Sequence, residues 1–169
     1  MRSKDPSTLR ITDLWKFKST KSNKWYIVEM EYISRNLIAV KFYYKGVRWS
    51  DQRYSLLTGD YEPRTIVYSC LELMKRYYLK DDTVSFGFVA AEDIDPQKRS
   101  SRGNRRFRFY RTVVNYYFGT KTFVHLQDES DRLYLLLNKK QIMNGSLVVK
   151  DEIDNINNIY EGDFNFSWD

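Results

Sequence analysis

Residues 84–91, Val-Ser-Phe-Gly-Phe-Val-Ala-Ala, form a nearly continuous apolar run. A run of this length fits a strand, and a strand without alternating polar residues is buried on both of its faces. A chain that holds such a strand must cover both sides of a sheet. The run therefore predicts a layered fold in which this strand occupies a central place.

The segments on either side of this run are predicted to be helices. Pro63 stands at an early helical position, which is a common start signal, and the apolar residues after it recur at helical spacing. Asn104 is the expected N-cap of a second helix and Gly119 its expected end. Broad apolar stripes indicate that both helices lie on a sheet; they comprise Ile66, Val67, Cys70, Leu71, Leu73, Met74, Tyr77 and Tyr78 in the first, and Phe107, Tyr110, Val114, Tyr117 and Phe118 in the second.

Runs rich in β-branched and aromatic residues predict the remaining strands. They cover residues 24–33, 37–44, 47–57, 121–127 and 132–138, with another short strand at 146–150. The predicted order is β-β-β-α-β-α-β-β. We therefore expect a single α+β domain with a mixed, mostly antiparallel sheet and two main helices. Its expected divisions are an N-terminal extension (1–22), the α+β domain (23–150) and an acidic aromatic tail (151–169).

Composition excludes several classes of site. One cysteine excludes an internal disulfide and a cysteine-rich zinc site, and one histidine excludes a multi-histidine metal site. No apolar run reaches the roughly 20 residues of a membrane span. The first residues are charged and lack the apolar core of a signal peptide, so the expected compartment is the reducing cytosol. The sequence identifies no cofactor.

The densest charge feature is a basic segment, residues 98–111, which contains no acid. Cations at a helix N-terminus typically cost about 0.3–1 kcal/mol each, so helix stability does not explain their placement. Free backbone N–H groups and arginine forks at such an end favour an anion, and neighbouring rings suit base stacking. The predicted nucleic-acid or anion-binding residues are Lys98, Arg99, Arg102, Arg105, Arg106, Arg108 and Arg111, with Phe109 and Tyr116. The alternative is a solvated surface paired with Glu92, Asp93 and Asp95.

Three other features carry weaker chemical signals. Glu92, Asp93 and Asp95 follow a central strand, where carboxylates can hold Mg²⁺, although surface charge is the commoner explanation. His125 has no identifiable cysteine or serine partner and is expected to be a packing or surface residue. Cys70 lies in the apolar stripe of the first helix and is expected in the core.

The C-terminal 19 residues contain six acids and no basic residue, while the rest of the chain carries all 28 Lys and Arg. Residues 151–158 are rich in Asn and Asp and are expected to form a loop. Phe164, Phe166 and Trp168 alternate, a pattern that can add a strand to a sheet edge. This partner-binding tail is expected to dock on its own domain or on a second copy. Capture by another protein and shielding of the arginine site are the alternatives.

The predicted element order over residues 24–139 resembles the later part of the GCN5-related N-acetyltransferase fold. In that family, amides of a glycine-rich loop before the first of these helices hold the pyrophosphate of coenzyme A, an anion at a helix N-terminus. The corresponding stretch here, residues 57–62, has one glycine and two acids, Asp60 and Glu62, that repel a pyrophosphate. Asn104 followed by Tyr110 is similar to the Asn-to-Tyr spacing of the family's next helix. The resemblance implies a V-shaped opening between neighbouring parallel strands.

A second resemblance is to a family of uncharacterised small bacterial α+β proteins. It is carried by Thr58-Gly59-Asp60 before a helix, by Ser85-Phe86-Gly87-Phe88, and by Arg106-Phe107-Arg108-Phe109-Tyr110 at the start of the next helix. This resemblance implies the α+β fold and no activity.

Three functions follow as hypotheses. We expect a non-catalytic binding protein whose arginine-rich helix N-terminus contacts nucleic acid or an acidic partner surface. The first alternative is a degenerate or divergent acyltransferase-like enzyme. The second is a structural module of a larger assembly, formed with copies of itself or with another partner. The sequence does not choose between DNA, RNA and protein.

Overall fold

The computed structural model describes residues 2–4, 10–54, 63–90, 105–128, 130 and 132–168. In chain order the elements are β1 (Arg2–Lys4), β2 (Ile11–Lys18), β3 (Trp25–Tyr32), β4 (Leu37–Tyr44), the 3₁₀ turn η1 (Lys45–Val47), α1 (Pro63–Lys80), β5 (Ser85–Val89), α2 (Arg105–Thr122), β6 (Phe123–Asp128), β7 (Leu133–Asn138), α3 (Lys139–Met143), α4 (Val149–Tyr160) and β8 (Ser167–Trp168).

All of these strands belong to one sheet in the order β1-β2-β3-β4-β5-β7-β6-β8. Every neighbouring pair is antiparallel except β4 and β5, which run parallel. The helix α1 connects these two strands, as a parallel connection requires. The fold is therefore the predicted α+β domain with a mixed, mostly antiparallel sheet.

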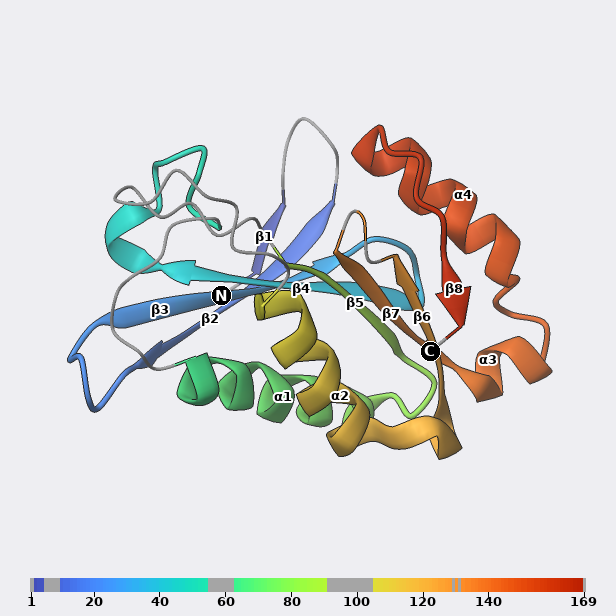
Figure 1. Ribbon diagram of the computed structural model, residues 1–169, viewed down its shortest axis with the longest axis horizontal. Helices are drawn as coiled ribbons and strands as arrows, with labels where there is room; N and C mark the ends of the chain where they lie inside the picture. The colour runs from blue at the N-terminus through green and yellow to red at the C-terminus, as the bar shows by residue number, and fades with distance from the viewer. Residues whose placement is uncertain are drawn as a thin grey trace.

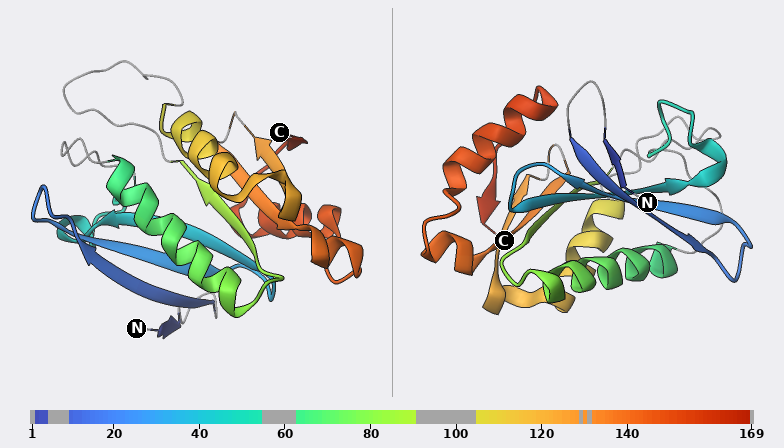
Figure 2. Two further views of the ribbon diagram at one scale, coloured as in Figure 1. Left: turned by 90° about the horizontal axis from the view of Figure 1, so that it is seen from below. Right: turned by 180° about the vertical axis from the view of Figure 1, so that it is seen from behind.

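Helices cover both faces of the sheet (Figures 1 and 2). On one face, α1 and α2 bury the larger core, and on the other face α4 buries a smaller cluster against residues of β4, β6 and β7. Strand β7 shows the division clearly, because Tyr134 and Leu136 belong to the first cluster while Leu133 and Leu135 belong to the second. Alternate side chains of one strand thus supply two separate cores.

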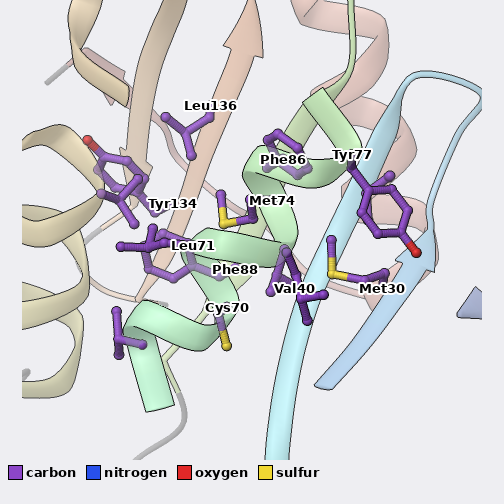
Figure 3. Close-up of a cluster of buried hydrophobic side chains, with 14 of the residues drawn as sticks. Met30, Val40, Cys70, Leu71, Met74, Tyr77, Phe86, Phe88, Tyr134 and Leu136 are labelled. Atoms are coloured by element: carbon purple, nitrogen blue, oxygen red, sulfur yellow. The ribbon is translucent and has the colours of Figure 1, made fainter. Parts of the chain in front are cut away.

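The larger core is built mainly from large aliphatic and aromatic side chains, in a sequence that holds only three alanines (Figure 3). Phe86 of β5 and Met30 of β3 are fully buried, and Met74 of α1 is buried with them. The predicted apolar stripe of α1 faces this core, and the predicted central strand is β5 with its neighbours on both sides. Both predictions are confirmed.

The N-terminal end of β5 is held by a buried polar cluster. Asn138 donates its backbone N–H to Ser85 Oγ at 2.9 Å and its side-chain amide to the carbonyl of Val84 at 3.2 Å. Ser85 Oγ in turn donates to Gln141 Oε1 at 3.1 Å. Such bonds are costly to break in a dry environment, so they hold β5, β7 and α3 together at this end.

The predicted strand at 47–57 is wrong. Residues 45–47 form the 3₁₀ turn and residues 51–54 a further turn, while 55–57 lie outside the described residues. Four strands, β1 to β4, precede α1, and the first two of them lie within the stretch expected to be an N-terminal extension. The aromatic residues that suggested a strand do not form one buried face of a sheet. Trp49 is 88% exposed, and Tyr54 packs its ring against Tyr43 of β4 from the turn.

The predicted strand at 146–150 and the predicted loop at 151–158 are also wrong, because residues 146–148 form no strand and α4 covers 149–150 and the whole of 151–158. Val149, Ile153, Ile156 and Tyr160 recur at helical spacing and face the smaller core. Asp151 and Glu152 stand in the first turn, where acids favour the helix dipole. These preferences outweigh the Asn and Asp content that suggested a loop.

Candidate ligand-binding cleft

The candidate site lies where β4 and β5 separate. The two strands pair at only three positions, from Leu37 opposite Ser85 to Ala39 opposite Gly87. Beyond them, β4 continues along β3 as far as Tyr44, while β5 continues along β7. The left panel of Figure 2 shows β4 and β5 diverging from their paired end. The sheet is therefore split between its two parallel strands.

A cavity of about 380 Å³ occupies this split. It is lined from both faces of the sheet, since successive β4 residues point to opposite sides. Val40 and Phe42 line it on the α1 side, and Ala39 and Lys41 on the α4 side. The cavity thus passes through the plane of the sheet, and its volume falls in the usual range of small-molecule sites.

The wall on the α1 and α2 side is apolar. It is formed by Val67, Cys70, Leu71 and Met74 of α1 and by Tyr110 and Val114 of α2. Burial raises the pKa of the Cys70 thiol to about 12. A thiol with so high a pKa stays protonated at neutral pH and is a poor nucleophile. Cys70 therefore supplies packing surface, as its sequence position predicts.

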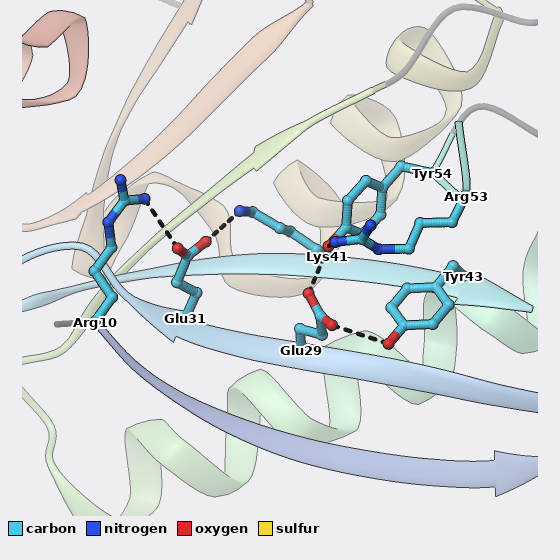
Figure 4. Close-up of polar contacts among 7 residues, drawn as sticks. All are labelled: Arg10, Glu29, Glu31, Lys41, Tyr43, Arg53 and Tyr54. Atoms are coloured by element: carbon cyan, nitrogen blue, oxygen red, sulfur yellow. Dashed lines mark hydrogen bonds and ion pairs between the residues drawn. The ribbon is translucent and has the colours of Figure 1, made fainter. Parts of the chain in front are cut away.

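The opposite wall carries a partly buried ion-pair cluster, of which Lys41 lines the cavity. Lys41 Nζ contacts one carboxylate oxygen of Glu31, and Arg10 Nη1 donates to the other at 2.9 Å (Figure 4). The ring of Tyr160 from α4 lies 5.4 Å from Lys41 Nζ. Burial lowers the pKa of Lys41, but Tyr160 and Glu31 raise it by more, so its net pKa lies above the usual value. Lys41 is thus an ammonium ion at the edge of an apolar cavity.

A second carboxylate, Glu29, lies beside this cluster and accepts two phenol hydrogen bonds (Figure 4). Tyr43 donates to it at 3.0 Å and Tyr54 at 2.6 Å. Burial, followed by the charge of Glu29, raises the pKa of Tyr43 to about 12. Burial and the bond to Glu29 likewise raise the pKa of Tyr54. Both hydroxyls therefore remain protonated donors at neutral pH.

The arrangement suits an extended ligand of mixed polarity. Its walls offer an apolar surface, and Lys41, Tyr54 and Tyr160 supply polar groups at one side. No ladder hydrogen bonds join β4 to β5 beyond Ala39 and Gly87. Main-chain groups that face this split are natural partners for amides in a ligand chain.

Another cavity, of about 430 Å³, lies between β2, β3 and the end of α1. Asp13 lines this cavity and accepts hydrogen bonds from Tyr77 at 2.7 Å and from Tyr32 at 3.2 Å. Trp15 Nε1 donates to Tyr77 Oη at 3.1 Å. These polar groups bond to one another, so the cavity is a less direct candidate than the split in the sheet.

The structure places the predicted anion-binding residues unevenly. Lys98, Arg99 and Arg102 lie outside the described residues, as do Glu92, Asp93 and Asp95, while Arg105 and Arg106 are the first two residues of α2. Arg108 is exposed, whereas Arg111 donates Nη1 to Gln127 Oε1 on β6 at 2.7 Å. Phe109 packs partly against the larger core, and Tyr116 is 88% exposed.

The aromatic tail lies on its own chain. Phe164 and Phe166 pack partly against the smaller core, and β8 pairs with Leu126 and Gln127 of β6. His125 is buried, with Nδ1 2.8 Å from Tyr134 Oη and Nε2 2.7 Å from the carbonyl of Gly119. This placement confirms that His125 is a packing residue.

Sequence reasoning missed the polar side of the cleft. Glu29, Glu31 and Lys41 are ordinary charges in alternating strands, and the signal that could have singled out Lys41 is its position within an otherwise apolar run, residues 37–44. Their proximity depends on the register of β3 and β4, in which Glu29 stands opposite Lys41. The sequence alone does not reveal that register.

Comparison with protein-family models, with curated proteins and with solved structures finds no match to this chain. Within the described ranges, no helix combines the length and apolarity needed to cross a membrane. In that same part of the chain, no cluster of three or more His, Cys, Asp or Glu side chains is arranged to hold a metal ion.

The raised pKa of Tyr43 predicts a loss of stability at high pH. The unfolded chain releases this proton near pH 10, whereas the folded protein holds it to about pH 12. The contribution of this proton to stability is therefore fully present below pH 10 and is lost as the pH rises from 10 to 12.

The variant Glu29→Gln tests this account, because it removes a negative charge and lowers the pKa of Tyr43. NMR titration of isotope-labelled tyrosine rings measures it, with Glu72→Gln on the exposed side of α1 as the control. Equal Tyr43 titrations in the wild type and Glu29→Gln would contradict this account.

Proposed function

We propose that the protein binds the pantetheine arm of an acyl thioester in the split between β4 and β5. The observation that carries this proposal is the three-pair parallel contact with a cavity of about 380 Å³ beyond it. A pantetheine arm is an extended chain with two amides, so it matches a channel that has apolar walls and strand edges. The resemblance to the acetyltransferase fold led us to expect an opening of this kind.

Two further features support the proposal. Residues 11–138 contain three strands, a helix, a strand, a helix and two strands, which is the element order of the resemblance with β2 in place of the strand predicted at 47–57. Tyr110, the residue at the family-like spacing from Asn104, lines the cavity. Its ring contacts Phe42 of β4 and Phe88 of β5, each at a centroid distance of 5.9 Å. Tyr110 thus bridges the two strands on either side of the split.

The diphosphate of coenzyme A is a separate question. By the resemblance it would lie at residues 57–62, which are outside the described residues and which include Asp60 and Glu62. Two acids disfavour a diphosphate, so we propose binding of the thioester arm without assigning a transfer reaction. A pantetheine arm is common to coenzyme A and to acyl carrier proteins, and both sources fit the cleft.

Val89→Trp tests the proposal, because Val89 lines the cavity and is 51% exposed, so the larger ring can enter the opening without displacing core residues. We expect at least about tenfold weaker binding of acetyl-coenzyme A and of S-acetyl-pantetheine in calorimetry, which corresponds to roughly 1.4 kcal/mol. Val148→Trp is the matched control, since Val148 is 53% exposed and does not line the cavity. Equal affinities in the two variants, or no binding by the wild type, would refute the proposal.

A second candidate function is binding of a polyanion such as nucleic acid by α2. Arg108, Thr112 and Tyr116 recur at a spacing of four residues and are all exposed, so they form one stripe of the helix surface. An exposed ring on the same helix stripe as an arginine suits stacking combined with a phosphate contact. The 88% exposure of Tyr116 is the observation that favours this candidate.

Arg108→Ala tests the second candidate by salt-dependent titration of single-stranded DNA and RNA. Loss of one phosphate contact lowers the affinity across all sequences and reduces the slope of log affinity against log salt by about 1. Arg35→Ala, an exposed arginine in the turn between β3 and β4, serves as the control. An unchanged salt slope in Arg108→Ala would remove α2 from the binding surface.

A further inference from the structure

Arg53 occupies a corner formed by two tyrosine rings. Its guanidinium carbon lies 4.6 Å from the ring centre of Tyr54 and 5.6 Å from that of Tyr43. The two rings stand nearly perpendicular, at 83°, with their centres 5.5 Å apart. Arg53 also donates Nη2 to Tyr54 Oη at 3.1 Å (Figure 4). A cation between two aromatic faces is a recurring mode of ammonium and guanidinium recognition.

Glu29 makes this corner more attractive to a cation. Both tyrosines donate their hydroxyl hydrogens to its carboxylate, which moves electron density toward the rings and strengthens their interaction with positive charge. Tyr54 Oη stands between Arg53 and Glu29, because it accepts from the first and donates to the second. The negative charge therefore lies behind the rings rather than in direct contact with Arg53.

The corner also adjoins a space of ligand size. Tyr54 and its neighbour Lys41 both line the cavity between β4 and β5. Arg53 itself is half-buried in a turn, so its side chain can leave the corner for solvent without disturbing a strand. A molecule in the cavity can thus place a positively charged group in the corner once Arg53 has left.

We propose that Tyr43, Tyr54 and Glu29 form a binding site for an external guanidinium or alkylammonium group, and that Arg53 fills this site in the free protein. Arg53 then acts as an internal competitor of the ligand. The proposal stands on different residues from the thioester proposal and does not depend on it, although the two sites share the wall at Tyr54.

The test removes the competitor. Arg53→Ala should bind n-butylguanidine at least about tenfold more tightly than the wild type, because a vacated corner no longer has to release its own cation. Butylurea, which has the same shape and no charge, should not bind. Arg48→Ala is the control for loss of nearby positive charge alone, since the charge of Arg48 also lowers the pKa of Tyr43 while its guanidinium lies over Trp49. Calorimetry and the chemical shifts of the Tyr43 and Tyr54 rings report binding.

Two more variants decide the outcome. Arg53→Gln keeps a polar side chain that is shorter and uncharged, and it should also gain binding, so a poorly folded Arg53→Ala does not end the test. Glu29→Gln combined with Arg53→Gln should lose the gain. The proposal is overturned if neither Arg53 variant binds butylguanidine more tightly than the wild type, if Arg48→Ala gains as much, or if butylurea binds equally well.

Discussion

The short parallel contact between β4 and β5 is the constraint on which the rest of this structure depends. It joins an antiparallel half made of β1 to β4 to a second half made of β5 to β8, and it does so through three residue pairs. The buried bonds of Ser85 and Asn138 hold the closed end of this junction. Because the junction is short, the two halves diverge and leave a cavity that crosses the sheet. A fully paired sheet would have no such space.

The two sides of this cavity differ in a way that follows from strand alternation. The face under α1 and α2 buries aromatic rings and the thiol of Cys70 in the larger core. On the face toward α4, Glu29, Glu31 and Lys41 lie close together. Charges this close to an apolar cavity need partners. Glu31 of β3 accepts from Arg10 and from Lys41 of β4, and Glu29 accepts from Tyr43 of β4 and from Tyr54 in the turn after η1. The site is therefore apolar along its length and polar at one edge.

Elements with one dominant physical cause were predictable from the sequence. The apolar run identified β5, and the helical stripes identified α1 and α2. Gly119, the expected end of the second helix, is the residue at which the helical backbone of α2 is interrupted. Strand β2 was missed because it lies near the sheet edge with Ile11 and Trp15 exposed, so it lacks a buried face. Helix α4 was missed because its Asn and Asp residues mask the spacing of its apolar ones.

The cleft itself was expected only as an implication of a resemblance, since the register of β4 against β5 cannot be read from periodicity. The most direct test of the account is the backbone NMR spectrum during titration with S-acetyl-pantetheine. The account predicts shift changes concentrated at residues 40–42 of β4 and 88–89 of β5, with α3 unaffected. Absence of any change at these amides, or changes confined to the exposed stripe of α2, would contradict it.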